Sequence, residues 1–64
     1  MTWREAEQAM ERGAAVRRAV WRPHVAVQMT AGGFLKYTNR QAEYWPSLEA
    51  TKATDWAEVS LEDG

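Results

Sequence analysis

The chain has 64 residues, no cysteine, one histidine and a formal net charge of −1. A chain of this size buries only about 60% of the surface that it exposes when unfolded, so residues 1–64 are expected to form a single domain with a small core. Without cysteine, disulfides and thiolate metal sites are excluded, and one histidine cannot build a metal site alone. Four tryptophans in so short a chain predict self-association as the missing source of stability.

The acidic residues gather towards the two ends of the chain, and the stretch from Arg12 to Lys36 contains no carboxylate. Duplex nucleic acid requires a broad basic surface, which this balance does not provide, whereas a small anion is compatible with the basic middle. No apolar run approaches the roughly 20 residues of a membrane span, and no signal peptide is evident. We therefore expect a soluble, cytoplasmic protein with no duplex nucleic acid or membrane partner.

The first predicted element is a helix over about residues 3–12. Thr2 and Glu5 have the spacing of a capping box, in which each side chain accepts a hydrogen bond from the backbone of the other. Gly13 supplies the left-handed residue that ends the helix. The apolar residues that recur at helical spacing are Trp3, Ala6, Ala9 and Met10.

Four extended segments are predicted after the helix, over residues 14–21, 25–29, 34–38 and 55–60. Proline at position 23 breaks the first, and the glycines at positions 32 and 33 form the hairpin turn between the second and third. A further extended piece over 41–45 and a brief helical turn capped by Ser47 come before the last strand, and residues 61–64 form an acidic tail that we expect to be frayed. The prediction is an α+β fold: a small antiparallel β-sheet packed with one N-terminal α-helix and a short second helical turn.

Residues 16–21 concentrate the binding chemistry, because Arg17 and Arg18 precede Trp21. Arginine donates paired hydrogen bonds to phosphate and stays charged, and tryptophan offers a flat face to a nucleobase. The alternative is an amphipathic strand with a packed tryptophan and solvated arginines. Arg17 and Arg18 point to opposite faces of an ideal strand, so the sequence does not say which one faces a ligand.

Other candidate ligand-binding residues lie further along the chain. Trp45 is either a lid over a ligand or a hydrophobic plug, and Asp55 either caps the turn into the last strand or accepts from a ribose hydroxyl. Tyr37 and Asn39 are polar-tipped residues that can contact a ligand. Because the chain lacks a paired acid and base, an activated nucleophile and a metal cluster, we expect no enzymatic activity and no cofactor.

The order of four motifs resembles the second Thoeris anti-defence family of phages and prophages (Thoeris anti-defence 2). The resemblance covers nearly the whole chain. The motifs are Trp3-x-Glu5-Ala6, Val16-Arg17-Arg18-x-x-Trp21, Trp45-Pro46-Ser47 and Ala53-x-Asp55-Trp56.

This resemblance implies a protein that sequesters a signal and does not cleave it. Members of the family capture cyclic ADP-ribose isomers made by TIR-domain defence proteins, and some also hold cyclic oligonucleotides. They are homo-oligomers, so the resemblance implies a dimer or tetramer with the site between protomers. The alternative is a small phage structural or regulatory protein that binds another protein through exposed aromatic side chains.

Overall fold

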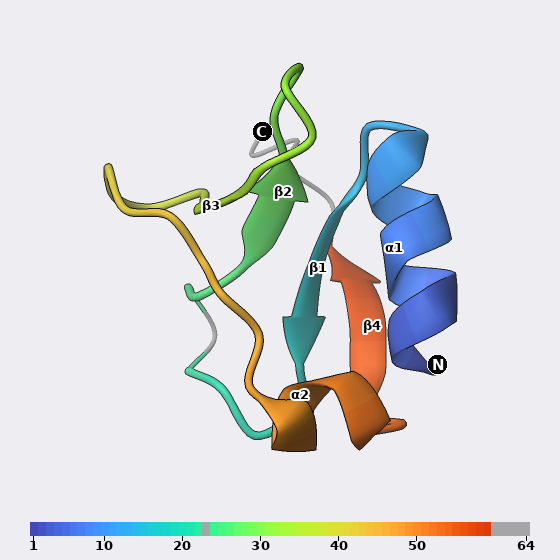
Figure 1. Ribbon diagram of the computed structural model, residues 1–64. Helices are drawn as coiled ribbons and strands as arrows, with labels where there is room; N and C mark the ends of the chain where they lie inside the picture. The colour runs from blue at the N-terminus through green and yellow to red at the C-terminus, as the bar shows by residue number, and fades with distance from the viewer. Residues whose placement is uncertain (23, 60–64) are drawn as a thin grey trace.

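Residues 1–22 and 24–59 are described by the computed structural model of the chain (Figure 1). The strands in this part of the chain form one antiparallel sheet in the order β3-β2-β1-β4, with α1 packed beside β1 and β4. The predicted α+β fold is therefore confirmed. The elements are α1 (Trp3–Glu11), β1 (Ala15–Arg18), β2 (Val27–Met29), β3 (Leu35–Tyr37), α2 (Leu48–Lys52) and β4 (Trp56–Val59).

The caps that the sequence predicts at Thr2, Gly13 and Ser47 are present, and α1 ends one residue before the predicted limit. The Thr2 Oγ1 atom accepts a 3.2 Å hydrogen bond from the Glu5 amide, and Glu5 Oε1 accepts a 2.8 Å bond from the Thr2 amide, which completes the capping box. At the other end of α1, Gly13 has a φ of 95°, a conformation that glycine adopts at little cost. Ser47 caps α2 by accepting a 3.1 Å bond from the Ala50 amide.

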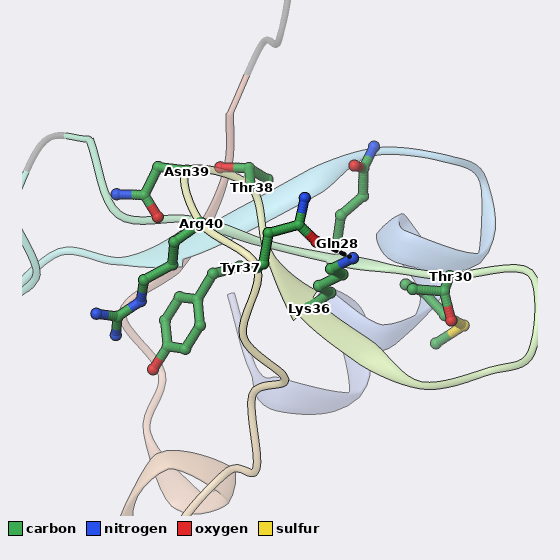
Figure 2. Close-up of a pocket in the computed structure, with 9 residues that line it drawn as sticks. Gln28, Thr30, Lys36, Tyr37, Thr38, Asn39 and Arg40 are labelled. Atoms are coloured by element: carbon green, nitrogen blue, oxygen red, sulfur yellow. Dashed lines mark hydrogen bonds between the residues drawn. The ribbon is translucent and has the colours of Figure 1, made fainter.

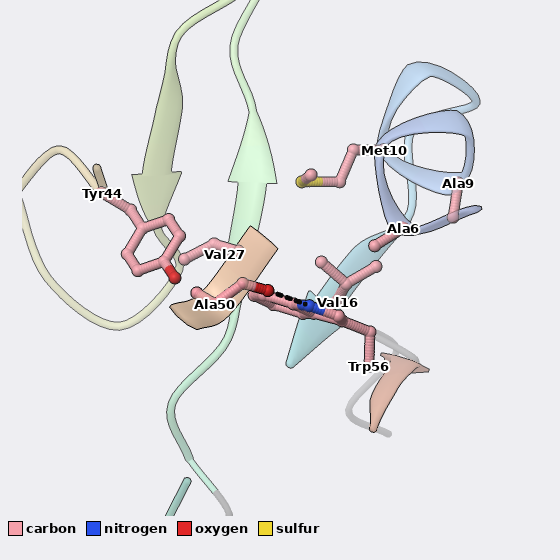
Figure 3. Packing of buried hydrophobic residues seen from close by; sticks show 8 residues of the cluster. All are labelled: Ala6, Ala9, Met10, Val16, Val27, Tyr44, Ala50 and Trp56. Carbon is pink, nitrogen blue, oxygen red and sulfur yellow. Dashed lines mark hydrogen bonds between the residues drawn. The ribbon is translucent and has the colours of Figure 1, made fainter. Parts of the chain in front are cut away.

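The core lies between α1 and the face of the sheet that α1 covers. Val16 and Val27 are opposite each other in register, and both are fully buried. The Trp56 ring crosses this core, and its Nε1–H donates a 3.0 Å hydrogen bond to the Ala50 carbonyl (Figure 3). Trp56 thereby joins α2 to the sheet. The buried cluster consists of Ala6, Ala9, Met10, Val16, Val27, Tyr44, Ala50 and Trp56.

The first strand is shorter than predicted, because the chain turns away after Arg18. The Ala19 amide still donates a 3.1 Å hydrogen bond to the Asp55 carbonyl, but the Trp21 amide donates back to the Arg18 carbonyl at 3.0 Å. Trp21 therefore lies in a turn and not on a strand face, which corrects the predicted strand over 14–21. β2 starts at Val27 rather than at residue 25. The expected break at position 23 and the tail from 60 onwards lie outside the described residues.

Within the described part of the chain, backbone hydrogen bonds reach the outer side of β3 and, at Trp56 alone, the outer side of β4. The Tyr37 amide donates to the Ala42 carbonyl at 3.0 Å, and the Tyr44 amide donates to the Leu35 carbonyl at 2.9 Å, so the predicted extended piece pairs with β3. Beside β4, the Met1 ammonium donates a 2.8 Å hydrogen bond to the Trp56 carbonyl. The pairing along β3 brings the aromatic residues at positions 44 and 45 next to the turn that holds Trp21.

Neither α1 nor α2, the two helices in the described part of the chain, is long and apolar enough to cross a membrane.

Candidate functional site

A hollow of about 600 Å³ lies at the C-terminal end of β1, and both aromatic rings and arginines line it. We call it the aromatic hollow. Its volume is in the range of pockets that hold small ligands. It is lined by Arg18, Trp21, Tyr37 and Trp45, four of the residues that the sequence analysis selected, which come from three separate parts of the chain. Its aromatic and arginine residues are Trp21, Tyr37, Tyr44, Trp45, Arg18, Arg22 and Arg40.

Trp21 is fixed by edge-to-face packing. Its ring centroid lies 5.5 Å from that of Tyr44 at 73° and 5.3 Å from that of Trp56 at 83°. Such tilted pairs place the positive edge of one ring against the negative face of the other. The ring is half-buried, so it packs against the core and also lines the hollow.

Trp45 differs from Trp21 because it is 71% exposed. Tyr44, next to it in the chain, is 9% exposed and sits in the core cluster. Neighbouring residues of an extended segment point in opposite directions, so burying Tyr44 turns Trp45 outwards. Trp45 is the ring of the hollow that a ligand can cover most completely.

Arg18 is anchored to the wall of the hollow by Asp55. The Arg18 Nε atom lies 2.9 Å from Asp55 Oδ1, and Nη2 lies 3.4 Å from Oδ2. This hydrogen bonding lowers the pKa of the Asp55 carboxyl and raises the pKa of Arg18, so both groups stay charged at neutral pH. The structure gives Asp55 this structural role and does not place it in the lining of the aromatic hollow. Of the five N–H donors of Arg18, the pairing uses two.

Arg17 and Asn39 do not line the aromatic hollow. An Arg17 Nη2–H donates to the Trp21 carbonyl, and this bond holds the turn that follows β1. The Arg17 Nε–H is buried without a hydrogen-bond partner among the described residues. Asn39 is exposed and lines a different hollow. The structure therefore answers which of the two adjacent arginines faces this hollow: it is Arg18.

Two arginines of the hollow were not predicted. Arg40 places its Cζ atom 4.4 Å from the centroid of the Tyr37 ring, a cation–π contact. Arg22 follows Trp21 directly and is exposed at the same hollow. The only sequence signal for them was proximity in the chain, since Arg22 adjoins Trp21 and Arg40 lies three residues after Tyr37.

The polar groups of the hollow are not all cationic. Glu49, near the start of α2, lines it and is near enough to Arg18 to contribute to the raised pKa of that guanidinium. Burial raises the pKa of the Tyr44 hydroxyl, with a smaller contribution from Tyr37. Tyr44 is therefore neutral at physiological pH. The hollow thus offers cations near a row of neutral rings, with one carboxylate at its α2 side.

No family model, curated protein or solved structure matches this chain. Within residues 1–22 and 24–59, no group of three or more His, Cys, Asp or Glu side chains is placed to hold a metal ion.

Proposed function

We propose that this protein binds a cyclic nucleotide signal in the aromatic hollow and sequesters it without cleaving it. The observation that carries the proposal is the meeting of Trp21, Trp45 and the arginines Arg18, Arg22 and Arg40 around one space of about 600 Å³. A cyclic nucleotide presents flat bases and negative phosphates. Rings and guanidiniums recognise these two features respectively.

The expected interaction energies are sufficient for useful affinity. Stacking of a base on an aromatic side chain contributes roughly 1–3 kcal/mol, and a hydrogen bond from a charged group contributes about 1.5–3 kcal/mol. One stacked base and two arginine contacts therefore support a Kd in the micromolar range after the cost of ordering side chains. Arg40 and Arg22 are both exposed, so they can reorient towards phosphate.

The resemblance to the Thoeris anti-defence 2 family makes the proposal more specific. It favours a cyclic ADP-ribose isomer, with cyclic oligonucleotides as further ligands, and a phage protein that acts in the cytoplasm of the bacterial host. It also favours a dimer or tetramer with the ligand between protomers. Trp45 and Val20, which are 71% and 72% exposed at the hollow, are the side chains that a second protomer would cover.

Native mass spectrometry tests binding and the fate of the ligand together. The purified protein is mixed with cyclic ADP-ribose isomers, with cyclic dinucleotides and, separately, with filtrates of cells that carry active TIR-domain defences. We expect an oligomer with the added mass of one of these compounds, and heating should release that compound unchanged. A linearised or hydrolysed product would instead identify an enzyme, and an unliganded oligomer in every mixture would reject nucleotide binding.

Two exposed residues provide a matched pair of variants for this binding. Trp45→Ala removes a ring of the aromatic hollow, whereas Leu48→Ala removes an apolar side chain that is also 71% exposed but does not line the hollow. We expect Trp45→Ala to weaken nucleotide binding by roughly 1–3 kcal/mol and Leu48→Ala to leave it unchanged, as measured by isothermal titration calorimetry. Equal affinities of the two variants would remove Trp45 from the site.

A second candidate function is protein binding through exposed aromatic side chains. A groove of about 380 Å³ between α1 and the β2–β3 hairpin is lined by apolar groups that include Trp3, Phe34 and Pro46, and Phe34 is 56% exposed. If this groove is the functional surface, Phe34→Ala should abolish association with the partner, while Arg40→Gln should have no effect on it. If the protein instead binds a nucleotide in the aromatic hollow, Arg40→Gln should weaken that binding and Phe34→Ala should leave it unchanged.

A further inference from the structure

A second hollow of about 600 Å³ lies over β2, β3 and the turn that follows β3 (Figure 2). We call it the polar hollow. Gln28 and Lys36 are opposite each other in register, so they share one face of the sheet. Val27 and Tyr37, the neighbouring pair, share the other face, which α1 and the aromatic hollow occupy. Its main polar side chains are Gln28, Thr30, Lys36, Thr38, Asn39 and Gln41.

Hydrogen bonds hold three of the polar side chains of this hollow, those of Gln28, Lys36 and Gln41. The Lys36 ammonium donates a 3.2 Å hydrogen bond to Gln41 Oε1, and the Gln28 side-chain amide donates a 3.3 Å bond to the Gly13 carbonyl. Gln28 and Lys36 are both half-buried, so neither side chain extends freely into solvent. Lys36 keeps two N–H donors and Gln28 keeps its carbonyl oxygen and one N–H for a ligand.

The charges of the polar hollow favour an anion. Lys36 and Arg40 line it, and no carboxylate among residues 1–22 and 24–59 does so. Glu43 is paired with Lys36 across an isolated β-bridge, so it shares this face of the sheet at the edge of the hollow. Figure 2 shows Arg40 lying alongside the Tyr37 ring, away from the Lys36 ammonium, so the cation most directly presented to this hollow is Lys36. A phosphate group can accept from both remaining N–H donors of this lysine.

The neutral groups of the polar hollow favour hydroxyls over a base. Three amide side chains and two threonine hydroxyls line it, and these groups both donate and accept, as sugar hydroxyls do. Its one aromatic residue, Tyr37, directs its ring towards Tyr44 on the other side of the sheet, at a centroid distance of 5.5 Å. We propose that the polar hollow is a second binding site, which takes a small phosphorylated sugar and shares only Tyr37 and Arg40 with the lining of the aromatic hollow.

Ribose 5-phosphate is the probe that tests this site, with inorganic phosphate and ribose as comparison compounds. Two-dimensional NMR of the intact 64-residue chain follows the side-chain amide signals of Gln28, Asn39 and Gln41 during each titration. We expect saturable shifts of these signals with ribose 5-phosphate and weaker binding of phosphate or ribose alone. The indole signals of Trp21 and Trp45 report the aromatic hollow and should stay in place.

The two lysines of the chain give a matched pair of variants. Lys36→Gln removes the ammonium of the polar hollow, and Lys52→Gln makes the same change on exposed α2. We expect Lys36→Gln to weaken ribose 5-phosphate binding about tenfold, the effect of losing one charge-assisted hydrogen bond, and Lys52→Gln to have no effect. A thermal melt of each variant checks that it is folded.

Three results would overturn the proposal. The first is that the side-chain amide signals of Gln28, Asn39 and Gln41 do not shift when ribose 5-phosphate is added. The second is that Lys36→Gln and Lys52→Gln bind ribose 5-phosphate with equal affinity. The third is inorganic phosphate binding as tightly as ribose 5-phosphate, which would exclude the sugar. None of these results bears on nucleotide binding in the aromatic hollow, so the two proposals fail separately.

Discussion

Trp21 has a structural role that any binding experiment must account for. Its half-buried ring contacts Tyr44 and Trp56 edge-to-face, at centroid distances of 5.5 and 5.3 Å. We expect Trp21→Ala to lower the free energy of unfolding by about 2–3 kcal/mol, because it leaves a gap beside the core and removes two ring pairs. Urea denaturation measures this loss.

Trp45, and not Trp21, is therefore the ring whose removal tests ligand binding without disturbing the fold. With 71% of its surface exposed, Trp45 should cost less than about 0.5 kcal/mol of stability when changed to alanine. A Trp21→Ala variant as stable as the natural chain would show that the ring pairs contribute little.

The Arg18–Asp55 pair makes the stability of the fold sensitive to acid. The hydrogen bond from Arg18 lowers the pKa of Asp55 in the folded protein, so the unfolded chain takes up this proton first as the pH falls. The stabilisation is thus present above the unfolded-state pKa near 4 and is lost as the pH falls through the lower folded-state pKa.

Asp55→Asn tests this linkage. The variant should be less stable than the natural chain at pH 7, and the difference should shrink as the pH is lowered below about 4. Thermal melts at several pH values measure the difference. A stability difference between Asp55→Asn and the natural chain that stays constant down to low pH would mean that Asp55 stabilises the fold through its shape and not through its charge.

At the scale of an element, α1 depends on its N-terminal cap. Thr2→Ala removes the acceptor of the Glu5 amide bond and should cost about 1 kcal/mol of stability. Thr54→Ala is the matched control, because Thr54 is exposed and no hydrogen bond of its hydroxyl to another described residue is present. The circular dichroism signal of the helices is followed during urea denaturation of each variant. Equal denaturation midpoints for Thr2→Ala and Thr54→Ala would contradict the cap assignment.

Elements defined by short-range contacts were predictable from the sequence, whereas strand ends were not. Thr2 and Glu5 are three residues apart, so their bond follows from the sequence alone. The end of β1 depends on where β4 begins, since Arg18 is paired with Trp56 and the next amide reaches only the Asp55 carbonyl. That pairing spans most of the chain, and alternation of side chains over residues 14–21 carries no information about it.

The candidate site was predicted only in part, because some of its contacts join residues that are far apart in the chain. Ring and guanidinium chemistry identified Arg18, Trp21, Tyr37 and Trp45, which the fold brings to one hollow. The contribution of Arg40 was not predicted, because it depends on the turn after β3 placing the guanidinium over Tyr37. The Arg18–Asp55 pairing joins residues 37 positions apart, and nothing local to either residue indicates it.

At the scale of the whole molecule, ligand binding and association should both raise stability. A ligand present at a hundred times its Kd should add about 2.7 kcal/mol to the free energy of unfolding. If protomers associate as proposed, the melting temperature should also rise with protein concentration. Melts at several concentrations, together with sedimentation velocity, check this. A melting temperature independent of concentration and a sedimentation coefficient of one 7.3 kDa chain would exclude the oligomer.

Five aromatic rings form a continuous row from α1 to the aromatic hollow. Successive ring centroids of Trp3, Trp56, Trp21, Tyr44 and Tyr37 lie 4.9, 5.3, 5.5 and 5.5 Å apart, and every pair is tilted. Rings this close exchange excitation, so we expect coupled aromatic bands in the ultraviolet circular dichroism of the folded chain, and light absorbed by Tyr37 should emerge as tryptophan emission. A molecule that covers Tyr37 should therefore reduce the tryptophan emission excited through that ring, and the row of rings would then report binding optically without an added label.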